Sequence, residues 1–278
     1  MKTSDSCAAC LYRRQKEVHN DPEYLRQVKE ILDHRKPSDS SPYLSEKFRI
    51  ISETMFGPGK SLAPEKRKFN DLVLGMEDAL WKKIQASEDP LKTAVLYSRV
   101  GNYIDFGTVD VDEKTFLGMF DQASMSKSDL ETYALFREDM KSAKNFVLLA
   151  DNCGEIVLDK LLIRELKQLY LGLHASVVIR GAEVLNDVTE EDAVQVRLAD
   201  DADVIPNGIR ISATIYDLVN DESKRVIDEA DVIVSKGLGN YEGFTGSGIP
   251  AYYLFLCKCD LFTERFQVPL MTGMFVKE

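Results

Sequence analysis

The chain has 278 residues, of which 44% are apolar, so it can bury a sizeable hydrophobic core in one large domain or two unequal ones. Its 46 acidic residues exceed its 35 lysines and arginines, and the net charge of −11 argues against binding to nucleic acid or to anionic membrane surfaces. No segment has the roughly 18 apolar residues of a membrane span, nor is there an apolar signal-peptide core, so a cytoplasmic location is expected.

Residues 1–142 are predicted to be almost wholly helical. Ser128 and Glu131 form a capping-box pattern ahead of one helix, and the apolar stripes along the region are interpreted as packing faces. Three further helix starts are marked by a proline, twice with a capping residue before it: Asp21-Pro22, Ser41-Pro42 and Pro64. The region is therefore expected to form a helical unit of one or two subdomains.

Residues 143–278 show a different rhythm, in which short runs rich in Val, Ile and Leu alternate with amphipathic helical segments. This alternation predicts an α/β core with a mainly parallel sheet. The predicted strands are 145–150, 175–180, 202–205 and 231–235, with a late edge pairing near 266–276. Apolar residues between the first two strands recur at helical spacing, which predicts a helix that packs on the sheet.

Polar and charged residues follow each predicted strand, and the carboxyl ends of parallel strands meet at one edge of a sheet. Carboxylate and amide oxygens suit Mg²⁺ or Mn²⁺, and cationic side chains suit phosphate, so the pattern predicts a metal and phosphate site. In strand order the residues are Asp151, Asn152 and Glu155; Arg180, Gly181, Asn186 and Asp187; Asn207 and Gly208; and Lys236, Gly237, Asn240 and Glu242.

Each of these residues also has an ordinary interpretation. Asp151 and Asn152 are good helix caps, Asp187 could cap a helix that begins near Thr189, and Lys236 could be a solvated charge. Because the ordinary interpretation must then hold at four successive strand ends, a functional site is favoured.

The five cysteines, in a chain without a recognisable secretion signal, suggest thiols and not a disulfide framework. Cys7 and Cys10 have the spacing of a metal clip, and Cys257 with Cys259 would complete a four-thiolate structural zinc site if the fold brings them together. Thiols that lie close together without a metal are the alternative.

Three segments carry a resemblance to a known family: Asp-Asn-Cys-Gly-Glu at 151–155, Asn-Asp-Val-Thr-Glu-Glu-Asp-Ala at 186–193 and Lys-Gly-Leu-Gly-Asn-Tyr-Glu at 236–242. Their types and their order resemble the signature segments of the DUF89 family, also called ARMT1-like or damage-control phosphatases. The CxxC at 7–10 and the segment Gly-Asn-Tyr-Ile-Asp-Phe-Gly at 101–107 resemble the stand-alone microbial and archaeal branch.

This resemblance implies a three-layer α/β/α core with helical subdomains, and a metal-dependent phosphatase acting on small phosphorylated metabolites such as sugar phosphates or damaged cofactor precursors. It implies Mn, Co, Ni or Mg as the metal, bound by Asp151, Asn152 and Asp187. The residues expected to contact substrate are Asn102, Asp105, Arg180, Asn240 and Glu242, with Lys236 near the phosphate.

The mechanistic hypothesis is that the metal makes phosphorus more electrophilic while Lys236 stabilises charge on the phosphoryl oxygens. The nucleophile is either a water with Glu155 as general base or Asp151 itself. Two alternatives from other functional classes are a carboxyl methyltransferase and a noncatalytic, metal-dependent metabolite-binding protein.

Overall fold

A computed structural model of the protein describes residues 3–102, 118–120 and 123–278, so Asp105 lies outside the described residues. The helices before the sheet are α1 (Asp5–Val18), α2 (Pro22–Asp33), α3 (Ser41–Phe56), α4 (Ala63–Leu74), α5 (Glu77–Gln85), α6 (Pro90–Gly101) and α8 (Lys127–Met140). The later helices are α9 (Glu155–Leu169), α10 (Glu190–Gln195), α11 (Asp221–Asp228), α12 (Gly237–Phe244) and α13 (Asp260–Phe266). The strands are β1 (Asn145–Leu149), β2 (His174–Ile179), β3 (Asp203–Pro206), β4 (Val232–Lys236), β5 (Tyr252–Leu256) and β6 (Gly273–Lys277).

The described residues form one six-stranded sheet with the order β3-β2-β1-β4-β5-β6. The first five strands run parallel, and β6 pairs antiparallel with β5. The predicted mainly parallel α/β sheet is thus confirmed, as are four of its strands. The prediction missed β5, whose five-residue apolar run has no period that separates strand from buried helix. The predicted edge pairing at 266–276 is correct only at its end, because α13 extends to Phe266 and β6 begins only at Gly273.

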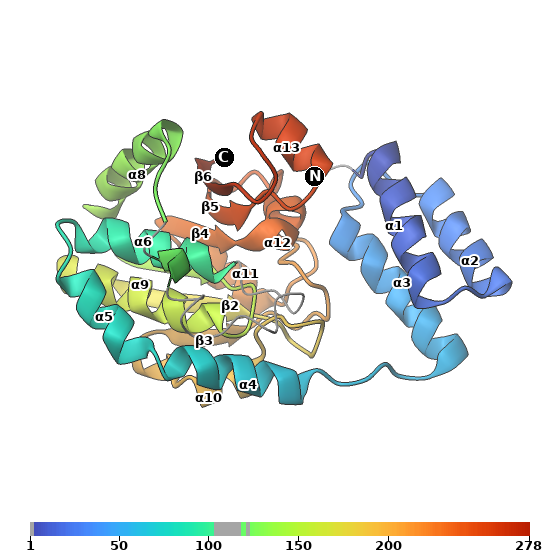
Figure 1. Ribbon diagram of the computed structural model, residues 1–278, viewed down its shortest axis with the longest axis horizontal. Helices are drawn as coiled ribbons and strands as arrows, with labels where there is room; N and C mark the ends of the chain where they lie inside the picture. Colours follow the sequence, from blue (N-terminus) through green and yellow to red (C-terminus); the bar gives the residue numbers. More distant parts are fainter. Residues whose placement is uncertain (1–2, 103–117, 121–122) are drawn as a thin grey trace.

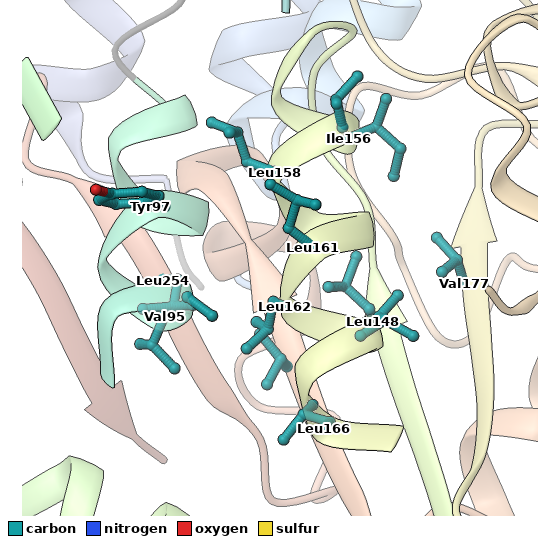
Figure 2. Packing of buried hydrophobic residues seen from close by; sticks show 14 of the residues in the cluster. Val95, Tyr97, Leu148, Ile156, Leu158, Leu161, Leu162, Leu166, Val177 and Leu254 are labelled. Carbon is teal, nitrogen blue, oxygen red and sulfur yellow. The ribbon is translucent and has the colours of Figure 1, made fainter. Parts of the chain in front are cut away.

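Helices cover both faces of the sheet and complete the predicted three-layer α/β/α arrangement. On one face α9 packs over β1 and β2 while α6 packs beside it over β5, as Figure 2 shows for Leu161, Leu148 and Val177 and for Val95 against Leu254. The opposite face is covered by α11, α12 and α13 through apolar side chains such as Ile227, Phe244 and Phe262. The sheet is therefore buried on both sides, as its near-continuous apolar strands require.

The helices of the amino-terminal half belong to two different cores. Helices α1, α2 and α3 pack on one another around Tyr24, Val28 and Phe48, and Figure 1 shows this bundle beside the rest of the molecule. Side chains from α4, α5, α6 and α8 instead join the same apolar cluster as α9 and the sheet. The boundary drawn at residue 142 therefore marks a change of secondary structure and not a boundary between hydrophobic cores.

Two helix starts differ from the sequence-based interpretation, those of α3 and α8. The N-cap of α3 is Ser40 and not Ser41, so Pro42 is one position further into the helix. The capping box of α8 consists of Ser126 and Asp129, and not of Ser128 and Glu131. Both pairs have the required spacing, but the Asp129 carboxylate also accepts hydrogen bonds from Arg99 and from the amide of Phe275, so tertiary contacts fix the helix start.

Within the described residues, no helix combines the length and apolarity needed to cross a bilayer.

Candidate active site

The site lies where the direction of the chain through the sheet reverses, between the carboxyl ends of β1 and β4. Open α/β sheets bind ligands at such a switch point because the loops that follow the two strands diverge there. Asp151 follows β1, and Gly237 follows β4 with a φ of 79°. A Cβ atom on Gly237 would overlap the Asp151 carboxylate, so only glycine lets the two loops approach this closely.

The backbone brings the two predicted metal-binding segments together. Asn152 forms an isolated antiparallel bridge with Asp187, and the amide of Val188 donates to the carbonyl of Asp151 at 2.8 Å. The amide of Cys153 donates to the carbonyl of Asn186 at 2.8 Å. These bonds place the side chains of residues 151, 152 and 187 at one edge of the sheet. Neither Asp151 nor Asn152 caps α9, since its N-cap is Gly154 and no side chain caps it.

Asp187 is held by two donors in a site that is almost fully buried. The Nε of Arg180 donates to Asp187 Oδ2 at 2.6 Å, and the Ser212 hydroxyl donates to Asp187 Oδ1 at 2.7 Å. Thr189, and not Asp187, caps α10. Burial raises the pKa of Asp187, although Arg180 and Ser212 oppose the shift. The carboxylate is thus fixed in position while its charge is only partly balanced.

Asp151 has more negative than positive charge around it. Its Oδ2 accepts hydrogen bonds from Asn102 at 3.0 Å and from Asn152 at 2.8 Å, and its Oδ1 lies 3.8 Å from Arg180. Burial, followed by the negative charges of Asp187 and Glu155, raises its pKa to about 8. A bound cation would offset this repulsion, which is the arrangement expected at a metal site.

The orientation of Asn152 also fits a cation. Its amide nitrogen donates to Asp151 Oδ2 and to Glu155 Oε2, both at 2.8 Å. Because the nitrogen points at the two carboxylates, the carbonyl oxygen occupies the opposite arm of the amide. Asp151, Asn152 and Asp187 therefore offer oxygen donors of the kind that hard divalent cations prefer.

Lys236 is not the solvated charge of the ordinary interpretation. It is fully buried, and its Nζ contacts Asp159 Oδ1 at 2.6 Å, Glu155 Oε1 at 2.7 Å and the carbonyl of Ser98 at 2.8 Å. Burial lowers the pKa of Lys236, but the charges of Asp159 and Glu155 outweigh it and the net shift is upward. Burial raises the pKa of Asp159 to about 6. The ammonium group therefore lies in a buried cluster and is not solvated.

Of the remaining predicted substrate contacts, Asn102 lies beside Asp151, whereas Asn240 and Glu242 are held in contacts with other parts of the chain. Asn102 reaches the site as expected, with its amide nitrogen on Asp151 and Glu155. Asn240 is fully buried. It accepts a hydrogen bond from Arg180 and donates one to the backbone carbonyl of Ala150, so it joins the segments that follow β2 and β1. Glu242 accepts a hydrogen bond from the amide of Ser41 at 3.3 Å, at the contact between α12 and α3. Burial raises the pKa of Glu242.

Sequence reasoning missed four residues that shape the site, namely Asn70, Ser98, Asp159 and Ser212. Asn70 is fully buried, and its side-chain oxygen accepts a hydrogen bond from the amide of Gly154 at 2.7 Å. Ser98 donates to Asp159 at 2.6 Å. Asp159 had a detectable signal, because it is a carboxylate at three-residue spacing from the apolar residues Ile156 and Leu162 of α9. The other three lie on helices or loops with no distinctive pattern.

The cysteines show no metal-binding geometry. All five are free thiols, with Cys153 and Cys257 buried and Cys7, Cys10 and Cys259 half-buried. Among the described residues, no three or more His, Cys, Asp or Glu side chains are grouped to hold a metal. The four-thiolate zinc site therefore stays a prediction. The predicted metal ligands Asp151, Asn152 and Asp187 are not such a group, because one of the three is the amide of Asn152.

Comparison with known proteins gives one consistent relationship. A damage-control phosphatase from Archaeoglobus fulgidus is 31% identical over 276 residues, covering 94% of this chain and 93% of that protein. A damage-control phosphatase from Pyrococcus horikoshii is 29% identical over 211 residues, covering 73% of this chain and 70% of that protein. The crystal structure of a DUF89 family protein from Pyrococcus horikoshii superposes with a TM-score of 0.81 at 22% identity, covering 100% of this chain and 99% of that one.

The family model described as the damage-control phosphatase ARMT1-like domain matches residues 3–272. This match spans the amino-terminal bundle, the three signature segments and strands β1 to β5, and it agrees with the resemblance found in the sequence. The chain belongs to the damage-control phosphatase ARMT1-like (DUF89) family.

Proposed function

We propose that this protein is a metal-dependent phosphatase that hydrolyses small phosphorylated metabolites. The observation that supports the proposal best is the group of oxygen donors from Asp151, Asn152 and Asp187 at the switch point of the sheet, where the two carboxylates lack full charge balance. The names of two relatives, both damage-control phosphatases, agree with it.

The chain's own residues supply orientation and charge. A divalent cation, when bound, would neutralise phosphoryl oxygens and make phosphorus more electrophilic. Arg180 keeps a positive charge beside both carboxylates, 2.6 Å from Asp187 and 3.8 Å from Asp151. Asn102 holds Asp151 from the end of α6. The donors are thus fixed before substrate arrives, which lowers the cost of reorganisation during the reaction.

Two routes account for the reaction with balanced bonds. In the first, a water oxygen bonds to phosphorus, the ester P–O bond breaks, and the leaving oxygen takes up a proton to give an alcohol and inorganic phosphate. In the second, an oxygen of Asp151 bonds to phosphorus while the ester P–O bond breaks and the leaving oxygen takes up a proton. A water oxygen then bonds to phosphorus and the aspartyl P–O bond breaks, which releases inorganic phosphate and restores the carboxylate. Glu155 is an unfavourable general base for the first route, because its carboxylate contacts Lys236, Asn102 and Asn152.

The test is hydrolysis of p-nitrophenyl phosphate and a panel of sugar phosphates by chelator-treated protein, with and without Mn²⁺, Co²⁺, Ni²⁺ or Mg²⁺. We expect turnover only after metal is restored and a loss of roughly 100-fold or more in Asp151→Asn. Asp203→Asn, which changes an exposed carboxylate at the edge of the sheet, is the matched control and should retain full activity.

Other outcomes would identify the alternatives. Tight binding of phosphorylated ligands without turnover at any metal would indicate a binding protein. Transfer of a labelled methyl group to a protein carboxylate, with no phosphate released, would indicate a methyltransferase.

A further inference from the structure

Next to the predicted metal ligands, one lysine and two carboxylates, those of a glutamate and an aspartate, are buried together. Lys236, Glu155 and Asp159 have at most 1% of their side-chain surface exposed. A lysine ammonium has three N–H donors. Here it donates hydrogen bonds to Asp159 at 2.6 Å and to the carbonyl of Ser98 at 2.8 Å, and it forms an ion pair with Glu155 at 2.7 Å. A phosphate oxygen could bind this ammonium only if one of these contacts were given up.

Glu155 extends the cluster to the metal-binding side chains. Its Oε1 contacts Lys236, while its Oε2 accepts hydrogen bonds from Asn152 at 2.8 Å and from Asn102 at 3.2 Å. Both amide nitrogens also donate to Asp151 Oδ2. The position of Glu155 therefore fixes which way two amides at the rim are turned, including the one that offers its oxygen to the metal.

Asp159 lies on the other side of the lysine, one helical turn after Glu155. Ser98 of α6 contacts both charges, since its hydroxyl donates to Asp159 at 2.6 Å and its carbonyl accepts from Lys236. Buried charges are tolerated only when they are paired and hydrogen-bonded. Lys236 is thus held between two carboxylates by helices α6 and α9, which pack against each other along their length (Figure 2).

We propose that Lys236, Glu155 and Asp159 form a buried clamp of positioning residues that orients Asn152 and Asn102 at the metal site, and that Lys236 does not contact the phosphate. The inference rests on the proposed function, because it assigns these residues to that metal site. It differs from the family-based expectation, in which Lys236 lies near the phosphate.

Two affinities separate the roles of Lys236. Lys236→Met removes the ammonium but keeps the length of the side chain. Calorimetric titration of metal-free protein with Mn²⁺, and then of Mn²⁺-saturated protein with inorganic phosphate, measures each affinity without turnover. We expect the Mn²⁺ dissociation constant to rise about tenfold while the phosphate dissociation constant stays within about twofold of the wild type.

A matched control removes another buried lysine, Lys160, from helix α9, which also carries Glu155 and Asp159. Lys160 pairs with Glu77 at 2.9 Å and does not contact Glu155, so Lys160→Met tests the loss of a buried charge on α9 by itself. We expect wild-type affinities for both Mn²⁺ and phosphate in this variant. Circular dichroism melts of both variants confirm that folded protein is being titrated.

A second variant decides the question if Lys236→Met fails to fold. Asp159→Asn leaves the pair between Lys236 and Glu155 intact, and we expect a several-fold rise in the Mn²⁺ dissociation constant with unchanged phosphate affinity. In either variant, weaker phosphate binding at saturating Mn²⁺, or unchanged Mn²⁺ binding, overturns the clamp. If the wild type itself binds no divalent cation, the proposed function fails as well, so the two failures are distinguishable.

Discussion

At the scale of single residues, the site depends on a few polar side chains and on one glycine. Asp151 is positioned by amides from Asn102 and Asn152, and Asp187 by Arg180 and Ser212. Gly237 has no substitute, because it combines a left-handed φ with direct contact to Asp151. Its conformation and its size are both required by the close approach of two strand ends.

Gly237→Ala is therefore expected to reduce phosphatase activity roughly 100-fold, since the new methyl group must displace the Asp151 carboxylate by an ångström or more. The control is Gly246→Ala, at a glycine that also has a positive φ but has open space around its Cβ position. Both variants should lose about 1 kcal/mol of folding free energy from backbone strain. Turnover and urea denaturation measure the two effects, and equal activity in both variants would refute the steric argument.

At the scale of elements, α4 holds the turn that follows β1. The side chain of Asn70 accepts from the amide of Gly154 and donates to Asp192 at 3.0 Å and to Gln195 at 2.8 Å. It thereby satisfies a backbone donor at the start of α9 and joins that helix start to α10. A helix from the amino-terminal half is thus part of the support for the metal-binding loops.

Asn70→Ala should lower the free energy of unfolding by about 2 to 3 kcal/mol, because it leaves the buried amide of Gly154 without its acceptor. Activity should fall as well, since Asn152 and Glu155 flank that turn. Gln195→Ala removes one partner of Asn70 but keeps the bond to Gly154, so it should cost less than about 1 kcal/mol. Chemical denaturation of both variants checks the difference, and similar losses would contradict the assigned role of Asn70.

At the scale of the whole molecule, the site joins parts of the chain that are far apart in sequence. Its side chains come from the end of α6, the loops after β1 and β2, the segment before α11 and the start of α12. An unfolded chain does not hold these groups together, so a cation that binds here binds the folded state selectively.

Saturating Mn²⁺ should therefore raise the melting temperature of chelator-treated protein by about 5 to 10 °C. This follows from about 2.7 kcal/mol of stabilisation at a metal concentration 100 times the dissociation constant, spread over a chain of this size. In Asp187→Asn, which keeps the shape of the side chain but loses its charge, the shift should shrink to less than about 3 °C. Differential scanning calorimetry with and without Mn²⁺ is the measurement, and an equal shift in both proteins would place the metal elsewhere.

Local patterns in the sequence were sufficient for the class of fold and for the position of the site along the chain. The strands predicted at 145–150 and 231–235 have apolar centres, at 146–150 and 232–234, and polar residues begin where each apolar run stops, because a strand covered on both faces favours apolar side chains. The type of β5 was ambiguous for the same reason, since an apolar run of five residues fits a helix or a strand.

The sequence by itself determined that Asp151, Asn152 and Asp187 meet at one edge of a parallel sheet, since strand direction alone brings them there. Only the tertiary structure decided what surrounds Lys236. A lysine at a strand end is equally compatible with a phosphate contact and with a solvated charge. The packing of α6 against α9 instead places Ser98 and Asp159 around its ammonium. Such partners are separated by 77 and 138 residues, and pairing over that distance is set by helix packing and not by any local pattern.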